Sequence, residues 1–397
     1  MNNLNETENE EFDVAVVGGG PGGATAAYQL GKNGFDVALV DKEKFPRHKT
    51  CGGMLTEKVY QLNQKVFDVS FQELETENII NSTSNGYETW NKNRCILKGS
   101  TDFNYGMVDR KVYDDFLFSK TRALEGVKVF EETKITGIDH EKMTLTGPGD
   151  GKIKAKYIIG ADGASSTIRK SLMENNKIKI SKKRWKKNLA AAIEAYVPKT
   201  SVDRKIRTPL LHLGVVEWGY GWVFPHADRY VVGVGGLPDK NDNFRKLLMD
   251  YLDLLDMGGK DYEIKGAPVP YGNYISDPGY QNILLIGDAA GLTDPLTAEG
   301  IFYAQFSGWL AARTINNCKE NQYVSSEYAE KLNENVIPEL KWAKFLRKLF
   351  FSGPEFIRRP VIKFLLPKIA DNLLEIFHGQ KSYNFFRSRK LEFFKNQ

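Results

Sequence analysis

The first forty residues place apolar runs and glycines in an order that predicts a specific succession of elements. Asp13–Val17 is apolar and β-branched, which is typical of a buried parallel strand. Glycines follow at once, and the segment Gly22–Lys32 then predicts a helix that Gly34 ends. Val37–Val40 predicts the next strand. Strand, turn, helix and strand in this order predict the beginning of a doubly wound α/β fold.

Two later apolar runs predict further strands, each followed closely by an aspartate. Lys156–Gly160 leads to Asp162, and Ile283–Ile286 leads to Asp288. Beyond the second of these, the segment Pro295–Ile301 is expected to open a long helix.

Three aromatic residues alternate along another predicted strand. Tyr220, Trp222 and Phe224 are two residues apart, so their side chains point to one face of the sheet. Such a face either lines a long apolar slot or packs the sheet onto a core. Gly233 and Gly235 favour the slot, because glycines inside a strand mark a close approach of another group to the backbone.

The glycine cluster after the first strand has the spacing of a dinucleotide-binding turn. Gly18 allows the tight turn, Gly20 lets a pyrophosphate approach the backbone beside Pro21, and Gly23 lets the helix pack close to the strand. Asp41, at the end of the second strand, is expected to accept hydrogen bonds from a ribose diol. The alternative is a bare glycine turn. The motif by itself does not separate NAD from FAD.

Length and cysteine content narrow the class of protein. A chain of 397 residues buries a large core and usually forms two or more domains. Three scattered cysteines, Cys51, Cys95 and Cys318, predict no disulfide framework. The first ten residues are polar and acidic, which predicts no signal peptide, and no apolar run of about 18 residues predicts a membrane span. We therefore expect a reducing, cytoplasmic setting.

The remaining polar patterns argue against metal and nucleic-acid binding. His48, His212 and His226 stand apart with no metal-ligand spacing, so we predict no metal site. The basic run Lys177–Lys187 is expected to be a solvated loop. No known nucleic-acid module is present, so we predict no nucleic-acid partner.

Charge is distributed unevenly along the chain. Residues 341–397 hold 13 Lys or Arg against 4 Asp or Glu, whereas the rest of the chain is slightly acidic. A helix is expected there with one apolar face, formed by Trp342, Phe345, Leu346, Leu349 and Phe350. Because this helix is both basic and aromatic, it has two interpretations. It either lies on an anionic membrane surface, which would make the protein peripheral at the inner face of the membrane, or packs on the body of the protein with its charges in water.

Taken in order, the Gly18, Asp162 and Asp288 segments resemble the FAD-binding pattern of the para-hydroxybenzoate-hydroxylase-like flavoproteins. The resemblance implies that Asp162 lies beside the pyrophosphate and that Asp288 holds ribityl or ribose hydroxyls of the flavin. It also implies that the N–H groups of Gly300 and Ile301 face the flavin pyrimidine edge. Positive charge at a helix N-terminus stabilises an anionic reduced flavin.

The segments between these motifs resemble the geranylgeranyl reductase family. Lys49–Gly53 is similar to its Lys-x-Cys-Gly-Gly element, and Tyr220–Gly235 fits its Tyr-x-Trp-x-Phe-Pro-x(7 or 8)-Gly-x-Gly element. Asp294–Ile301 is close to a third element, with Ala298 where a glycine is common. Met107–Arg110 resembles the segment that supplies an arginine near the flavin. The resemblance covers roughly residues 12 to 310.

This resemblance implies reduction of carbon–carbon double bonds in a polyprenyl chain, with FAD as cofactor and NADPH or another reductant as electron donor. The family places its cysteine near the reactive edge of the flavin. Cys51 either relays a proton there or is a small residue in a loop shaped by Gly52 and Gly53. Arg47 is expected to pair with a phosphate of FAD or substrate, because a guanidinium matches that geometry.

Motifs and resemblance together predict one site and one architecture. We expect a doubly wound FAD-binding domain with an inserted mixed β-sheet substrate domain and a helical C-terminal region. The predicted cofactor-binding residues are Gly18, Gly20, Pro21, Gly23, Asp41, Arg47, Cys51, Gly52, Arg110, Asp162, Asp288, Gly300 and Ile301, and the predicted substrate contacts are Tyr220, Trp222, Phe224 and Pro295. The predicted segments are a disordered tail (1–11), FAD domain (12–70, 108–176, 276–320), substrate domain (71–107, 177–275) and basic helical region (321–397).

Two other functions fit parts of the pattern. A flavin monooxygenase or halogenase shares the fold, and Phe45–Arg47 and Tyr220–Pro225 are near halogenase elements. Cys51–Gly53, however, stands where halogenases have Gly-Glu-Ser. The second alternative is a membrane-surface flavoprotein that binds without turnover.

Overall fold

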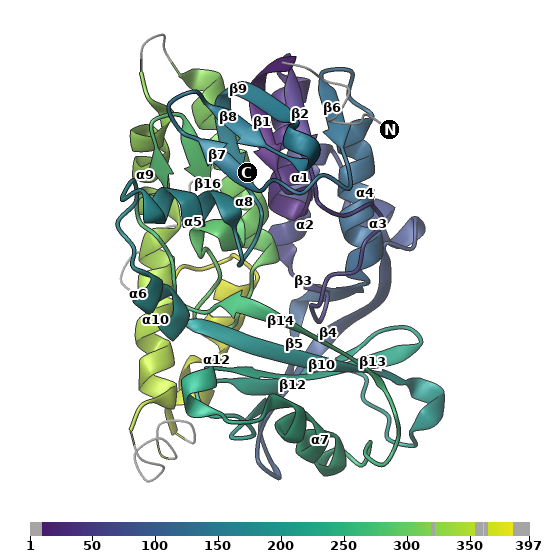
Figure 1. Cartoon of the computed structure of the whole chain (residues 1–397). Helices are drawn as coiled ribbons and strands as arrows, with labels where there is room; N and C mark the ends of the chain where they lie inside the picture. The colour runs from purple at the N-terminus through teal and green to yellow at the C-terminus, as the bar shows by residue number, and fades with distance from the viewer. Residues whose placement is uncertain (1–9, 319–321, 354–359, 361–363, 384–397) are drawn as a thin grey trace.

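Two β-sheets, with helices packed on each, build the molecule (Figure 1). The computed structural model describes residues 10–318, 322–353, 360 and 364–383. One sheet and its helices form the upper half in Figure 1, the other sheet forms the lower half, and α10 runs along the side of both. The chain passes between the halves several times, so segments far apart in sequence meet where the halves face each other.

The first sheet has the doubly wound arrangement that the N-terminal pattern predicts. Its central path runs β15-β16-β9-β1-β2-β6, and every pair is parallel except β15 with β16. The hairpin partners β7 and β8 extend it through an antiparallel pairing of β8 with β9. Its strands are β1 (Glu10–Val17), β2 (Val37–Val40), β6 (Val127–Phe130), β7 (Gly137–Asp139), β8 (Thr144–Thr146), β9 (Lys152–Gly160), β15 (Gly279–Tyr280) and β16 (Ile283–Leu285).

Two helices of this half pack through glycines. Helix α1 (Pro21–Lys32) crosses α8 (Ile301–Asn317), where a Cβ at Gly22 would lie 2.8 Å from the carbonyl oxygen of Ala304. A Cβ at Gly308 would overlap the Gly22 carbonyl. The small residues therefore hold the N-terminal turn of α1 close to α8. The other helices here are α2 (Glu57–Phe67), α3 (Phe71–Thr76), α4 (Arg110–Arg122), α5 (Thr167–Glu174), α9 (Val324–Asn335) and the 3-10 helix η5 (Gly287–Ala290).

The second sheet has two different faces. One face packs on α7 (Phe244–Leu254), where Leu248 and Tyr251 meet valines such as Val223 and Val232 in a separate core. The opposite face turns towards the first half of the molecule. The strand order is β14-β10-β13-β12-β11-β4-β5-β3, with β3 (Met54–Leu55), β4 (Ile80–Asn91), β5 (Arg94–Val108), β10 (Leu189–Pro198), β11 (Leu210–Leu213), β12 (Tyr220–Pro225), β13 (Arg229–Gly236) and β14 (Glu263–Pro270).

Two predicted segment assignments and one predicted loop differ from the structure. Strand β1 begins at Glu10, so the last two residues of the predicted 1–11 tail belong to the sheet, where they pair with Ile153 and Lys154. Strand β3 lies inside the segment 12–70 yet pairs with β5 of the second sheet. The basic run predicted to be a loop contains a short helix, α6 (Lys182–Lys187), begun by the Ser181 side chain, which caps Arg184 N–H. The remaining segment boundaries stay predictions.

Helix α10 (Ile337–Phe351) packs on the body through one side. Leu346 and Phe350 are buried, but Phe345 and Leu349 are exposed, so the predicted single apolar face is split between core and surface. Arg347, expected in water, is 2% exposed. Helix α12 (Leu366–Phe377) follows and contacts β5. Within the described ranges, no helix is long and apolar enough to cross a membrane.

Candidate functional site

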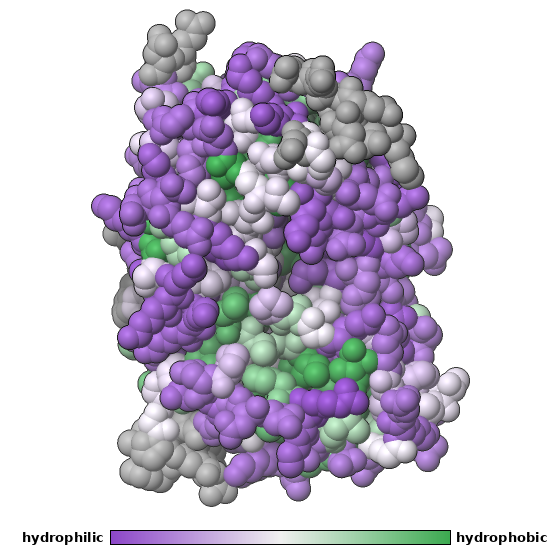
Figure 2. Space-filling view, viewed as in Figure 1, coloured by the Kyte–Doolittle hydropathy of each residue, from purple (hydrophilic) through white to green (hydrophobic). Residues whose placement is uncertain are grey.

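A cavity of about 790 Å³ lies between the two halves and is lined by residues of all three glycine- and aspartate-containing motifs. The aromatic strand β12 and the Cys51–Gly53 loop close it from the side of the second sheet. In Figure 2 the hydrophobic surface of this face gathers over the region where the second sheet meets the upper half, within a mostly hydrophilic surround. Of the predicted site residues, all line the cavity except Gly23 and Pro295.

The first wall is the glycine turn that leads into α1. Gly18 has φ +108°, and a Cβ there would overlap the backbone of Ala161, so this position requires glycine. A Cβ at Gly23 would overlap the Gly18 carbonyl, which explains the third glycine by packing rather than by ligand contact. The first backbone N–H groups of α1, which Pro21 begins, stand at the cavity edge. Such a helix N-terminus favours a bound anion.

Asp41 holds this turn in place. Its Oδ2 accepts a hydrogen bond from Gly19 N–H at 2.6 Å, and its Oδ1 accepts one from Glu43 N–H at 2.9 Å. The side chain is 6% exposed, and burial raises the pKa of its carboxyl group. Asp41 therefore stabilises the glycine turn after β1 and also lines the cavity.

Two further aspartates face the cavity from the strand ends of the first sheet. Asp162 Oδ2 accepts hydrogen bonds from Thr167 N–H at 2.6 Å and Ile168 N–H at 3.3 Å, whereas its Oδ1 is buried with no partner among the described residues. Burial raises the pKa of the Asp162 carboxyl group. Asp288 Oδ1 accepts a hydrogen bond from Thr293 Oγ1 at 2.9 Å. Each carboxylate keeps acceptor capacity for a ligand.

The turn before α8 differs from the predicted early start of that helix. Asp294 Oδ1 accepts hydrogen bonds from Leu296 N–H at 2.7 Å and Thr297 N–H at 2.9 Å, which folds the chain into a turn. The helix begins only at Ile301, so Thr297–Ile301 faces the cavity while Pro295 is buried away from it. Pro295 therefore does not line this cavity, and its predicted substrate contact stays a prediction.

Ala298 occupies a strained position in this turn. Its φ is +56°, in the left-handed region that glycine adopts without a steric penalty. Such a conformation favours glycine, which the resemblance gives as the common residue at this position.

The aromatic strand covers the other wall. The Trp222 indole lies over Gly233, where a Cβ would overlap the ring, and the Phe224 ring lies over Gly52 in the same way. Tyr220 donates a hydrogen bond to the Thr297 carbonyl and so ties β12 to the turn before α8. Trp222 Nε1 is buried with no hydrogen-bond partner among the described residues. Because Gly233 and Gly52 have no side chains, the two rings can pack directly on the backbone. The aromatic face is part of the cavity lining.

Two arginines share one carboxylate at the edge of the cavity. Arg110 donates to both oxygens of Asp114, from Nε at 2.7 Å and Nη2 at 2.8 Å. Arg47 Nη1 lies 3.2 Å from Asp114 Oδ2, and its Nη2 is 3.2 Å from the position of a Cβ at Gly20. The Arg47 guanidinium thus stands beside the glycine turn, and the excess of positive charge over Asp114 favours an anion there.

Comparison with known proteins agrees with this geometry. A family model described as an FAD binding domain matches residues 11–202. An uncharacterized protein of Methanosarcina barkeri is 30% identical over 351 residues, covering 87% of this chain and 85% of that protein. Digeranylgeranylglycerophospholipid reductase of Methanococcus aeolicus is 29% identical, covering 89% and 90%. Menaquinone reductase of Mycobacterium tuberculosis is 26% identical, covering 92% of both chains.

The chain belongs to the geranylgeranyl reductase family of FAD-dependent oxidoreductases. A geranylgeranyl bacteriochlorophyll reductase-like protein of Thermoplasma acidophilum has the same fold, with a TM-score of 0.72, 20% identity and coverage of 94% and 93%. The flavin-dependent brominase Bmp2 has a TM-score of 0.70 at 18% identity, covering 96% of both chains. At these identities the two structures establish the shared fold alone.

The residues of this family member fit FAD. At Gly20, which lines the cavity, a Cβ would have only Arg47 Nη2 within 4 Å, at 3.2 Å, so a ligand can approach the backbone there. The buried Asp162 Oδ1 has no protein partner in the described chain. The start of α1 offers N–H groups to a pyrophosphate, and the start of α8 at Ile301 offers them to a second anionic group. Among the residues that the structure describes, no group of three or more His, Cys, Asp or Glu is arranged to hold a metal ion.

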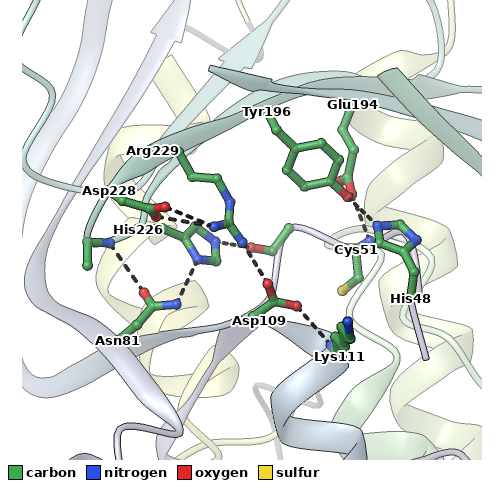
Figure 3. A network of polar contacts seen from close by, with 12 residues as sticks. His48, Cys51, Asn81, Asp109, Lys111, Glu194, Tyr196, His226, Asp228 and Arg229 are labelled. Atoms are coloured by element: carbon green, nitrogen blue, oxygen red, sulfur yellow. Dashed lines mark hydrogen bonds and ion pairs between the residues drawn. The ribbon is translucent and has the colours of Figure 1, made fainter. Parts of the chain in front are cut away.

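Sequence reasoning missed the polar residues that support the Cys-Gly-Gly loop of the family (Figure 3). His226 Nε2 is 2.9 Å from the Gly52 carbonyl oxygen, and its Nδ1 is 3.3 Å from Asn81 Nδ2. Burial lowers the pKa of His226, so the ring is neutral near pH 7. Glu194, from β10, accepts the Cys51 N–H at 2.9 Å. The one feature of the sequence that indicates Glu194 is its place as a lone glutamate in the apolar run Leu189–Val197.

Proposed function

We propose that this chain reduces carbon–carbon double bonds in a polyprenyl lipid with FAD as cofactor. The observation that carries the proposal is the continuity of one cavity from the glycine turn at Gly18 to the aromatic strand at Trp222. A cofactor bound along the first wall then meets a substrate held along the second. Relatives named as reductases of geranylgeranyl lipids support the same assignment.

The lining of the second wall favours an apolar chain. Trp222, Phe224 and Val269 contribute ring and aliphatic surface, and the small side chains of Ala190 and Ala192 on β10 leave room between them. A prenyl chain is long, narrow and unable to accept strong hydrogen bonds, so such a surface binds it by excluding water.

Reduced FAD supplies hydride when it is bound. The residues of this chain then have three tasks: to hold the cofactor, to orient the alkene, and to supply a proton. The glycine turn, Asp41, Asp162 and Asp288 are proposed to hold the cofactor. The N–H groups at Gly300 and Ile301 are proposed to stabilise negative charge on the flavin ring. NADPH, or another two-electron reductant, is the proposed donor.

A membrane surface is the proposed source of the lipid. On the outer side of α10, Phe345 and Leu349 are exposed, and the exposed Lys341 and Lys348 lie on the same side at helical spacing. Apolar and cationic groups on one exposed face suit the surface of an anionic bilayer.

The experiment is anaerobic single turnover. Enzyme loaded with FAD is reduced and mixed with geranylgeranylated glycerophospholipid, geranylgeranyl diphosphate or menaquinone, and flavin reoxidation is followed by absorbance. Mass spectrometry then measures hydrogen gain in the prenyl chain. Reoxidation with a saturated product supports the proposal. Reoxidation by oxygen alone, with an oxygenated or halogenated product in air, would identify the monooxygenase or halogenase instead.

A further inference from the structure

A buried glutamate, Glu194, lies beside the Cys51–Gly53 loop of the cavity and has one carboxyl oxygen with no hydrogen-bond partner in the described chain. Glu194 is fully buried, lines the cavity and comes from β10. Its Oε1 accepts hydrogen bonds from Cys51 N–H at 2.9 Å and Tyr196 Oη at 2.7 Å. Its Oε2 is buried and has no hydrogen-bond partner among the described residues. A buried carboxyl oxygen without a hydrogen-bond partner does not stabilise the fold, so it favours a role in the reaction.

A chain of hydrogen bonds joins this glutamate to solvent (Figure 3). Tyr196 Oη, which donates to Glu194, is 3.0 Å from His48 Nε2. His48 is exposed and also lies at the cavity rim. Three titratable groups at hydrogen-bond distance therefore run from the outer surface to the cavity wall.

We propose that Glu194 is the acid that supplies a proton to the substrate, and that Tyr196 and His48 return a proton to it from solvent. The inference rests on the proposed function. Alkene reduction breaks one π bond and forms two C–H bonds. Hydride from reduced flavin forms one of them, and the proton from the Glu194 carboxyl group forms the other. The glutamate becomes a carboxylate and regains its proton through Tyr196 from His48.

The surroundings of Glu194 favour its protonated form. Burial is the largest influence and raises the pKa of its carboxyl group, while the Tyr196 hydroxyl, the Cys51 N–H and the charges of Lys49 and Arg110 oppose that rise. Burial next to Glu194 also raises the pKa of Tyr196, so this hydroxyl passes protons without ionising. A carboxyl group with a raised pKa keeps its proton to a higher pH than usual, so it can act as an acid nearer neutral pH.

His48 is suited to exchange protons with water. Burial lowers the pKa of its ring below 6.5, and Lys265 and Lys49 lower it further, whereas Asp109 and Glu263 raise it. The ring is therefore mainly neutral at pH 7, with one nitrogen to accept a proton and one to donate. This matches a residue that passes protons rather than one that holds a charge.

Cys51 is the competing donor. Its Sγ accepts the Gly53 N–H at 3.5 Å and interacts with Arg110. If the Cys51 thiol donates the proton, the role of Glu194 is to hold the loop by accepting the hydrogen bond from Cys51 N–H. Glu194→Gln separates the two roles, because the amide oxygen still accepts from Cys51 and Tyr196 but the side chain has no acidic proton.

The first test is single-turnover reoxidation of prereduced enzyme by a prenyl lipid. Glu194→Gln is expected to slow it by about 100-fold or more, the usual effect of losing a general acid. Tyr196→Phe and His48→Gln, which break the chain, are expected to slow repeated turnover. The wild-type rate should fall as pH rises through the raised Glu194 pKa. In Glu194→Gln this fall in rate should be absent. Tyr262→Phe is the control, since its hydroxyl bonds only the Met257 carbonyl in the described chain.

The second test needs no substrate. Infrared spectra of wild-type holoenzyme at neutral pH are expected to contain the C=O stretch of a protonated carboxyl group that shifts in D₂O and is absent in Glu194→Gln. If that band is unchanged in the variant, the proposal is overturned. Wild-type turnover with an equally fast Glu194→Gln overturns it too, and leaves the proposed function standing. Failure of the wild type with every prenyl lipid, with the band present, would overturn the proposed function and with it the role of Glu194 as the acid of that reaction.

Discussion

Trp222 and Gly233 are paired across strands β12 and β13, and the indole ring lies over the place where a side chain at residue 233 would begin. Gly233 is also paired with Glu194 on its other side. The absence of a side chain thus lets a large aromatic ring lie flat against the sheet next to a buried carboxyl group. This arrangement forms the wall of the cavity that is proposed to hold the substrate.

Gly233→Ala is expected to force the Trp222 ring out of place. Overpacking of this kind costs about 1–3 kcal/mol of unfolding free energy, measured by urea unfolding. Gly235→Ala on the same strand is the matched control, because its Cβ would lie 3.4 Å from the Trp222 ring, an ordinary contact. Equal loss in both variants would show that backbone effects, and not the ring, decide the result.

Trp222→Ala is expected to abolish lipid-driven flavin reoxidation while FAD stays bound. The ring lines the cavity, although it is only 9% exposed, so part of its surface also packs against the sheet. Single-turnover kinetics and thermal unfolding are measured on the same sample. A loss of about 3–5 kcal/mol in stability with unchanged turnover of the folded fraction would make Trp222 a core residue instead.

Asp288→Ala is expected to weaken FAD binding by about 1–3 kcal/mol, because a partly buried acceptor for cofactor hydroxyls is lost. Titration of apoprotein with FAD, followed by flavin fluorescence, measures the difference. Asp139→Ala is the control, because Asp139 is the exposed last residue of strand β7. Wild-type affinity in the Asp288 variant would remove this residue from the cofactor site.

Acid is expected to destabilise the docking of α12 through His378. This ring is fully buried against Phe103 and Tyr105, and burial, together with Lys58, lowers its pKa to about 4. The unfolded chain then binds more protons between pH 6.5 and pH 4, so stability is lost as pH falls through that window. The loss is about 2 kcal/mol by pH 5.

Urea unfolding of wild type and His378→Gln at pH 7.5 and pH 5 checks this expectation. The variant should be less sensitive to the change in pH. A wild type whose unfolding free energy does not change between the two values would refute the assignment.

Replacing both Phe345 and Leu349 by Ser is expected to reduce flotation with anionic liposomes without changing thermal stability, since both side chains are exposed. Point variants are needed because the buried side of α10 contributes to the core, so removing residues 341–397 would also unfold part of the body. Neutral liposomes are the control for the charge contribution. Unchanged flotation of the double variant would exclude this face as the membrane contact.

The sequence by itself determined the doubly wound sheet and its ligand-binding turns. Apolar runs such as Val37–Val40 and the glycines of the first turn specify local backbone geometry, and local geometry follows from neighbours in the chain. The alternation of Tyr220, Trp222 and Phe224 likewise specified a shared face, because the period of a strand is two. The family followed from the order of these motifs.

Only the tertiary structure decided which distant residues meet. The start of α8 depends on the turn folded by Asp294, and the burial of Arg347 depends on contacts with Tyr271 and Trp218. The approach of Glu194 to Cys51 joins residues 143 positions apart, and no local pattern encodes such a contact. Strand pairing across the second sheet brings them together, because burying the apolar face on α7 turns Glu194 towards the cavity.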